Sequence, residues 1–396
     1  MDEKRVTTNR TPRAALFVYI PYCPSVCTYC DFNVYARRAS EFDAYADAVA
    51  MEIELTAQAL QTPIQATSLA FGGGTPSILT LPQIEKIVGA ARRHWEFVSD
   101  AEWTLEANPG TVDLEKLRGL RELGFARLSL GVQTFDDARL QQFNRAHTVA
   151  QSFEAFELAR RAGFENINLD FMYGLPKQTP ADWRETLNRA LAFESEHLSL
   201  YGLQVEERTV LKKQIELGRV VQPDAEVAAE MYECAVDMLA AHGFVHYEIS
   251  NFAKPGFASR HNKTYWLNEP YLGFGAGAHS LWYDARGESI RYENVKSPRE
   301  YILRESRNES VIAKRESISP AMQMAETIFL GLRLAEGIAW ERFRARFGVD
   351  AREVYREQVD TLSKSKLLRV NDERMWLTEQ GMLLSNQLLW RFLPDE

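Results

Sequence analysis

Residues 20–32, IPYCPSVCTYCDF, hold three of the four cysteines of this 396-residue chain. Cys23, Cys27 and Cys30 have the spacing C-x3-C-x2-C and follow the apolar run AALFVYI at residues 14–20. A structural zinc site takes four protein ligands, and the four-iron cluster of an electron carrier takes four thiolates. Three thiolates on one short loop would leave one iron of a [4Fe-4S] cluster without a protein ligand. Such an open iron can bind a small chelating molecule and pass an electron to it.

Other interpretations of this cysteine loop are open from the residues alone. The thiols could be packed core residues, because free cysteine behaves as a small hydrophobic side chain. Pro21, Pro24 and Ser25 in the same loop speak against that. A distant His or Asp could complete a zinc site, whereas a disulfide framework would need an oxidising compartment and usually an even set of cysteines. We favour the open-iron cluster, with all three cysteines of the loop as its ligands.

The overall composition is that of an ordinary globular protein, with 45% hydrophobic and 26% charged residues. The net charge of −9 argues against a nucleic-acid surface, which would be basic. Residues 1–13, MDEKRVTTNRTPR, form a polar leader without the apolar segment of a secretory signal. We also find no apolar stretch of the roughly 20 residues that a membrane span needs. These features predict a cytoplasmic protein, in which free thiols and an oxygen-sensitive cluster survive.

From residue 14 to about 205, short apolar strands alternate with amphipathic helices, which is typical of repeated βα units and a parallel sheet. The predicted strands are Leu16–Ile20, Ser68–Phe71, Glu102–Glu106, Arg127–Val132, Asn166–Phe171 and His197–Val205. Six such units make a partial (β/α)6 barrel of the α/β class. Ligands of parallel α/β folds gather at the carboxyl ends of the strands. The cysteine loop follows the first strand and is therefore expected at that end.

The pattern changes beyond residue 205. A long helix is expected at Ala225–His242, followed by a loop-rich stretch with many glycines and aromatic residues to about residue 295. From about residue 298 onward the chain is mainly helical, which predicts a second, smaller C-terminal domain. We therefore divide the chain into the leader at 1–13, a core at 14–247 and a C-terminal region at 248–396.

Several polar or glycine-rich positions follow the predicted strands. The run FGGGTP at residues 71–76 would let backbone N–H groups approach a ligand closely, although taken alone such a run is more often a tight turn. Glu106, Gln133, Arg145 and Asp170 lie in or just after the third to fifth strands. Each of these side chains alone could be solvated or paired in a salt bridge. Their common position at the strand ends favours a binding site.

The cysteine motif, with Tyr29 before the last cysteine, resembles the signature of radical S-adenosylmethionine (SAM) proteins. The resemblance implies that the methionine amine and carboxylate of SAM chelate the open iron. The reduced cluster would then cleave the sulfonium to an adenosyl radical, chemistry that belongs to the cofactor. Gly73, Gly74 and Thr75 resemble the glycine motif that binds the methionyl amine of SAM.

The polar positions resemble one branch of these proteins more narrowly. Glu106, Gln133, Arg145 and Asp170 match the SAM-contacting positions of the coproporphyrinogen dehydrogenase-like branch. Carboxylate and amide groups suit the hydroxyls of a ribose, and a forked guanidinium suits a methionine carboxylate. The resemblance thus implies that these four residues bind SAM, with no further residue assigned to catalysis.

Residues 246–266, HYEISNFAKPGFASRHNKTYW, and the following YLGFGAGAHS resemble the HemW family of haem chaperones. The core of this stretch is the motif H-N-x-x-Y-W, which begins at His261. The resemblance implies that His261 is a haem ligand, and histidine is a common axial ligand of haem iron. From the residues alone, a histidine beside aromatic residues is more often a packed, hydrogen-bonded side chain than a ligand. His279 is a second candidate ligand, and Cys234, between two methionines of a helix, is expected in the core.

The resemblance covers residues 14 to 390 and implies a protein that binds haem and delivers it to apo-haemoproteins such as respiratory enzymes. It leaves open whether delivery occurs at a membrane surface and whether the protein forms a homodimer. One stretch departs from the family pattern, because VEERTVLKKQIELGR from Val205 lacks the Pro-Gly of the usual I-E-P-G-T.

The alternative function is that of an oxygen-independent coproporphyrinogen III dehydrogenase, or of another radical-SAM enzyme that acts on a tetrapyrrole. The dehydrogenases carry a fourth cysteine where this chain has Phe32, and they have a longer N-terminal extension. Both differences favour the chaperone.

Overall fold

The computed structural model describes residues 11–60, 63–283 and 288–394, so that most of the polar leader at 1–13 lies outside the described residues. Its centre is a row of parallel strands in the order β1-β4-β5-β6-β7-β8. These strands are β1 (Arg13–Ile20), β4 (Gln65–Gly73), β5 (Glu96–Ala107), β6 (Arg127–Gln133), β7 (Asn166–Tyr173) and β8 (His197–Gly202). All six predicted strands are therefore present in sequence order, and the α/β class with a partial barrel is confirmed.

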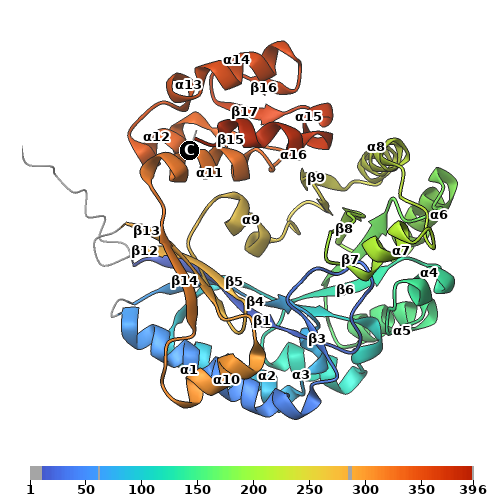
Figure 1. Cartoon of the computed structure of the whole chain (residues 1–396), viewed down its shortest axis with the longest axis vertical. Coiled ribbons are helices and arrows are strands. Elements are labelled where there is room, and N and C mark those ends of the chain that lie inside the picture. Colours follow the sequence, from blue (N-terminus) through green and yellow to red (C-terminus); the bar gives the residue numbers. More distant parts are fainter. Residues whose placement is uncertain (1–10, 61–62, 284–287, 395–396) are drawn as a thin grey trace, which may run out of the picture.

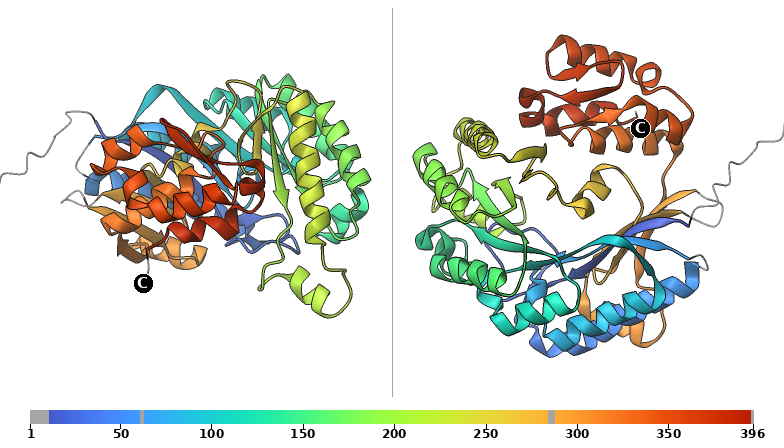
Figure 2. Two further views of the ribbon diagram at one scale, coloured as in Figure 1. Left: turned by 90° about the horizontal axis from the view of Figure 1, so that it is seen from above. Right: turned by 180° about the vertical axis from the view of Figure 1, so that it is seen from behind.

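A helix follows each of these strands and covers the outer face of the sheet (Figures 1 and 2). These helices are α1 (Phe42–Leu60), α2 (Leu81–His94), α3 (Leu114–Glu122), α4 (Asp137–Gln142), α5 (Val149–Arg161), α6 (Pro180–Leu191) and α8 (Ala225–Ala241). The apolar residues spaced along α1, among them Tyr45, Val49 and Ile53, are buried against the strands, as their helical spacing predicts. Because the sheet side of each helix is apolar, burial of these faces holds the barrel together.

The main sheet continues well beyond the six predicted strands. On one side β1 pairs in parallel with β11 (Tyr271–Phe274), and β12 (His279–Tyr283), β13 (Ser289–Asn294) and β14 (Ile312–Ser317) follow in antiparallel order. On the other side β8 pairs with β10 (Asn251–Ala253), which pairs with β9 (Val245–Glu248). The stretch predicted to be loop-rich thus supplies five strands.

The C-terminal residues form a smaller unit with its own hydrophobic core. Its buried side chains run from Ile328 to Phe392, whereas the core of the main sheet includes residues as late as Val311. The unit contains α11 (Pro320–Gly331), α12 (Trp340–Phe347), α13 (Ala351–Val354), α14 (Arg356–Lys364), α15 (Glu379–Leu383) and α16 (Ser385–Leu388). A three-stranded sheet of β15 (Ile338–Ala339), β16 (Leu368–Val370) and β17 (Arg374–Leu377) accompanies these helices. The mainly helical character is confirmed, and the second core begins later in the chain than residue 248.

Four short elements position the loops around the barrel. They are β2 (Tyr22–Cys23), β3 (Tyr35–Ala36), α7 (Val210–Glu216) and α9 (Arg260–Trp266), and α10 (Pro298–Ser306) packs beside α1. Helix α9 lies between the inner face of the main sheet and the C-terminal unit (Figure 1). Among the described residues, no helix is both long and apolar enough to cross a membrane.

Candidate functional site

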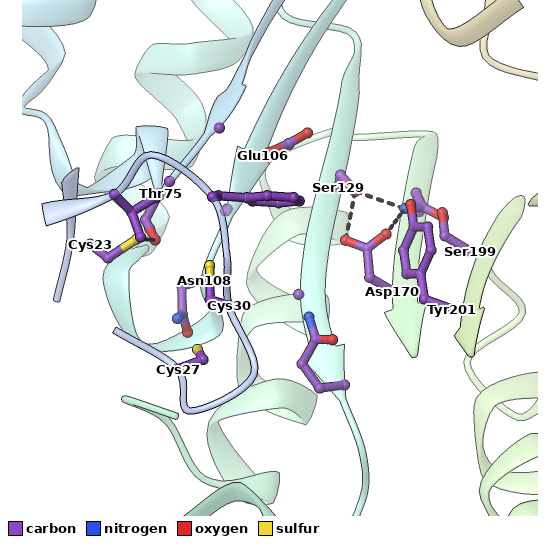
Figure 3. Close-up of a pocket in the computed structure, with 18 of the residues that line it drawn as sticks. Cys23, Cys27, Cys30, Thr75, Glu106, Asn108, Ser129, Asp170, Ser199 and Tyr201 are labelled. Carbon is purple, nitrogen blue, oxygen red and sulfur yellow. Dashed lines mark hydrogen bonds between the residues drawn. The ribbon is translucent and has the colours of Figure 1, made fainter. Parts of the chain in front are cut away.

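The inner face of the barrel encloses a cavity of about 700 Å³. Its walls include all the residues that the sequence assigned to a cofactor except the second haem-ligand candidate, His279: Cys23, Cys27, Cys30, Gly73, Gly74, Thr75, Glu106, Gln133, Arg145, Asp170 and His261. The three cysteines lie on one side of the cavity, and Asp170, Ser199 and Tyr201 lie on the other (Figure 3). The fold therefore brings together residues that are spread over more than half of the sequence.

The cysteine loop is fixed by hydrogen bonds to the segment after α4. Ser25 Oγ donates to the carbonyl oxygen of Asn144 at 2.7 Å, and Asn144 Nδ2 donates to the carbonyl of Val26 at 2.8 Å. The Thr28 N–H donates to the carbonyl of Phe143 at 3.1 Å. Asn144 adopts a φ of 57°, a left-handed conformation that asparagine tolerates better than most residues. These bonds hold the loop directly beside Arg145.

A second anchor holds the downstream end of the same loop. Asn33 Nδ2 donates to the carbonyl oxygens of Ala276 at 3.1 Å and Lys296 at 2.9 Å. A Cβ added at Gly277 would lie 2.6 Å from Asn33 Nδ2, so only glycine fits against this amide. The end of the loop is therefore shaped by residues that come much later in the chain.

The three thiols are free and have donors nearby. Thr75 Oγ1 donates to Cys23 Sγ at 3.5 Å, and Arg145 Nη1 donates to Cys27 Sγ at 3.3 Å. Burial raises the pKa of Cys23, and burial raises that of Cys30 to about 11. A positive metal centre would offset this cost, because a metal binds the thiolate form and favours it. Three thiols on one cavity wall, two of them with a donor aimed at sulfur, fit the ligands of an iron–sulfur cluster.

The glycine run after β4 forms a tight turn beside this loop. Gly73 has a φ of +101°, and an added Cβ would lie 2.7 Å from the ring of Tyr19. A Cβ at Gly74 would lie 2.7 Å from the carbonyl oxygens of Ile20 and Tyr22. The close packing of the turn against β1 explains these glycines by itself, and it also leaves the cavity wall free of side chains at this point.

Glu106 and Asp170 face the same cavity from β5 and β7. Burial inside the barrel raises the pKa of Glu106 to about 7, with a further contribution from the charge of Asp170. Asp170 accepts hydrogen bonds from Ser129 Oγ at 3.0 Å and from Asn168 Nδ2 at 2.7 Å, which hold its carboxyl group in place. Burial raises the pKa of Asp170 as well. Two fixed carboxyl groups of this kind can accept hydrogen bonds from sugar hydroxyls.

His261 is held tightly on α9. Its side chain is 3% exposed, Nδ1 is hydrogen-bonded with Ser68 Oγ at 2.8 Å, and Nε2 with the hydroxyl of Tyr265 at 3.0 Å. The ring also stacks on Phe17, and burial lowers the pKa of His261 to about 4. The imidazole is therefore neutral near pH 7, as a metal ligand must be. Iron coordination through Nε2 would require the Tyr265 hydroxyl to move away from that nitrogen.

The other residues of the H-N-x-x-Y-W motif lie in two different environments, the cavity wall and the contact with the C-terminal unit. Asn262 and Tyr265 line the cavity with His261. The ring of Trp266 instead lies under the guanidinium of Arg333, 5.5 Å from the ring centroid, and so contacts the C-terminal unit. One end of the motif thus faces the site, and the other end packs against α11 and the residues after it.

Glu102 of β5 fixes the start of α9. Its carboxylate accepts hydrogen bonds from Ser259 Oγ at 2.9 Å and from the backbone N–H groups of Arg260 and His261 at 3.0 Å each. Glu102 is buried, so the removal of its carboxylate would leave these donors without partners away from water.

We expect Glu102→Ala to lower the free energy of unfolding by about 1.5–3 kcal/mol, the usual contribution of hydrogen bonds to a charged group. Urea unfolding at pH 7 measures this loss. Asp100→Ala is the matched control, since Asp100 pairs with Arg260 at the exposed surface, where an ion pair contributes about 0–1 kcal/mol. Equal stability losses in the two variants would show that Glu102 does not hold α9.

Several cavity residues were not identified from the sequence. They are polar side chains that alternate along β5 to β8 and face inward, namely Thr104, Arg127, Ser129, Asn168, Ser199 and Tyr201. A period of two between polar residues in otherwise apolar strands is the signal that could have revealed them. The cavity wall therefore carries a set of polar side chains on β5 to β8 within an otherwise largely apolar lining.

Two further expectations concern residues outside the cavity. His279 lies at the start of β12 with its side chain 51% exposed, 3.8 Å from a carboxylate oxygen of Glu293, and it is not among the residues that line the cavity. Cys234 lies on α8, where it is partly buried, packs against the edge of the main core and contacts Met238 at 3.7 Å.

Fold and site together define a radical-SAM domain, and residues 17–190 match the Radical SAM superfamily. Residues 318–384 match the HemN C-terminal domain. The heme chaperone HemW of Bacillus subtilis is 38% identical over 96% of this chain and 99% of its own length. HemW of Escherichia coli K12 is 30% identical over 98% of this chain and 100% of its own. The chain belongs to the HemW family.

A mitochondrial relative and a solved structure extend the comparison. The mitochondrial radical S-adenosyl methionine domain-containing protein 1 of Bos taurus is 32% identical over 96% of this chain and 87% of its own length. The structure of coproporphyrinogen III oxidase (HemN) from Escherichia coli superimposes with a TM-score of 0.83 over 96% of this chain and 90% of that chain. Because the identity is 24%, this likeness shows a shared fold.

Proposed function

We propose that this protein is a cytoplasmic haem chaperone that binds a [4Fe-4S] cluster, SAM and haem and delivers haem to apo-haemoproteins such as respiratory enzymes. The observation that supports the proposal most directly is the single cavity shared by the cysteine loop, the glycine turn, the inward carboxylates and the H-N-x-x-Y-W helix. Membership of the HemW family supports haem as the cargo.

In this proposal the cysteine loop holds the cluster and the strand ends hold SAM. Cys23, Cys27 and Cys30 would ligate three irons, and the bound cluster would supply an electron at the open iron. Arg145 Nη2 donates a hydrogen bond to the carbonyl of Gly131 at 2.9 Å, and Nη1 donates to Cys27 Sγ. Its buried Nε has no hydrogen-bond partner among the described residues. This guanidinium can therefore meet a methionine carboxylate beside the cluster.

The carboxyl groups of Glu106 and Asp170 lie on the walls above and opposite the cysteines (Figure 3). They would accept hydrogen bonds from the ribose hydroxyls of SAM. Gln133 would contribute a side-chain amide from the end of β6. Gly73, Gly74 and Thr75 would face the methionyl amine. In this arrangement SAM lies beside the cysteine loop at the carboxyl ends of the strands. The motif helix α9 covers the part of the cavity nearer the start of β4, where His261 contacts Ser68.

The main test compares haem binding with coproporphyrinogen III decarboxylation after reconstitution with iron and sulfide. We expect the wild-type protein to bind haem and to show no decarboxylation, because Phe32 occupies the position of the dehydrogenases' fourth cysteine. Gel filtration with and without haem would show whether loading changes the oligomeric state. Decarboxylase turnover by the wild-type protein would overturn the proposed role.

We expect His261→Ala to weaken haem binding or shift the haem absorption spectrum, because an axial imidazole sets the ligand field of the iron. Tyr265→Phe removes the hydroxyl that occupies Nε2 and should leave haem affinity equal or higher. Absorption titration with haem measures both effects. The control is His279→Ala, which alters a half-exposed histidine outside the cavity wall. A wild-type spectrum and affinity in His261→Ala would remove His261 as the ligand.

A further inference from the structure

Two neighbouring groups on the cavity wall lack partners. Arg127 of β6 and Thr104 of β5 are register partners in the parallel sheet, and both line the cavity. Arg127 is 4% exposed and Thr104 is 6% exposed. Arg127 Nε and Thr104 Oγ1 are buried, and neither atom has a hydrogen-bond partner among the described residues. The Nε of a guanidinium and a hydroxyl thus lie side by side in the cavity wall with their hydrogen-bonding capacity unused among the described residues.

The charge of Arg127 has no direct partner within the described part of the chain. Among the described residues no carboxylate lies within ion-pair distance of it, although its charge acts on the buried carboxyl groups of Glu106 and Asp170. The nearby carboxylate of Glu102 is occupied by the start of α9. An unpaired buried cation costs several kcal/mol, so its presence on a cavity wall indicates a place for an anionic group.

Arg127 lies away from the cysteine loop along β6. Arg145, which contacts Cys27 Sγ, also donates to the carbonyl of Gly131, four residues beyond Arg127 on the same strand. At about 3.3 Å per residue, that is roughly 13 Å along the strand. SAM has one carboxylate, which the proposed function places beside the cluster. A carboxylate at Arg127 must then belong to another molecule.

The surroundings of Arg127 connect it with the motif helix. Thr104, its register partner, lies two residues beyond Glu102, whose carboxylate holds the start of α9. The aromatic rings of Phe17 and Tyr265 line the cavity beside this helix. A planar tetrapyrrole with carboxylate side chains suits such a combination of aromatic walls and one cation. We propose that Arg127, together with Thr104, binds a propionate of haem in the part of the cavity beside α9. This inference rests on the proposed haem-binding function.

The test compares haem with haem dimethyl ester, which lacks the carboxylates. We expect the wild-type protein to bind haem roughly 10- to 150-fold more tightly than the diester, the range for a charge-assisted contact. Arg127→Met should reduce haem affinity to that of the diester and leave diester affinity unchanged. Arg127→Lys, which keeps a charge without the fork, should retain part of the preference. SAM affinity should be the same in all three proteins.

Thermal unfolding without ligands separates binding from folding. Because Arg127→Met removes an unpaired buried cation, its Tm should equal or exceed that of the wild type. A clearly lower Tm would show a structural role and overturn the inference. So would an unchanged preference for haem over the diester, or a loss confined to SAM. If the wild-type protein binds no haem at all, the proposed function itself fails, and the inference fails with it.

Discussion

Cys27→Ala should abolish the reconstituted iron–sulfur cluster, and Cys23→Ala and Cys30→Ala should do the same. All three thiols line one wall of the cavity, and the resemblance assigns one iron to each. A cubane held by two thiolates would have two open irons and would be lost during desalting. Iron and acid-labile sulfide per protein, measured after reconstitution and gel filtration, give the result directly.

Cys234→Ala is the matched control for the cluster. Cys234 packs on α8 against the main core, so its loss changes packing and leaves the thiols of the loop intact. This variant should bind as much iron and sulfide as the wild type. Full cluster content in Cys27→Ala would contradict the assignment of the loop.

Arg145→Ala should weaken SAM binding roughly 10- to 150-fold, because a charge-assisted contact to the ligand is lost. Asp170→Ala should also weaken it through the loss of the ribose acceptor. Since Arg145 also touches Cys27, iron content is measured first, and SAM affinity is compared only between proteins with full clusters. Equilibrium dialysis with SAM then gives the two affinities.

The control for Arg145 is Arg139→Ala. Arg139 pairs with Asp136 and Asp182 near the start of α4 and does not appear on the cavity wall. Its loss should leave SAM affinity unchanged. Equal affinity of the wild type, Arg145→Ala and Asp170→Ala would place the SAM site elsewhere.

The barrel could be predicted because each of its units carries a local signal. A buried parallel strand is a short apolar run, and the helix after it shows apolar residues on one face. Strand β11 has no such signal, since its four residues lie in a glycine-rich stretch and its partner β1 is far away in sequence. Pairing between distant segments depends on tertiary packing, which no local pattern describes.

In the candidate site, too, some residues have a local sequence signal and others are brought into place only by tertiary packing. The cysteines and the glycine turn stand out by spacing, and the strand-end carboxylates stand out because charged residues are rare in barrels. The sequence pattern predicts only that Arg127 begins an apolar strand. The register of β5 and β6 places it beside Thr104 on the cavity wall. His261 bonds to Tyr265 within α9, but its bond to Ser68 joins α9 to β4. The sequence could therefore not show that both ring nitrogens are occupied.

The anchor at Asn33 has a consequence for the order in which the protein is made. The side-chain amide of Asn33 donates to the carbonyls of Ala276 and Lys296. These two residues lie 243 and 263 positions further along the chain. A ribosome adds roughly 5–20 residues per second, so these partners emerge on the order of tens of seconds after the cysteines. Until then the downstream end of the loop lacks its second attachment, and one edge of β1 has no neighbouring strand. In a nascent chain the three thiols therefore lie on a segment that is only partly held in place. In the completed chain the hydrogen bonds of Asn33 fix the downstream end of that segment.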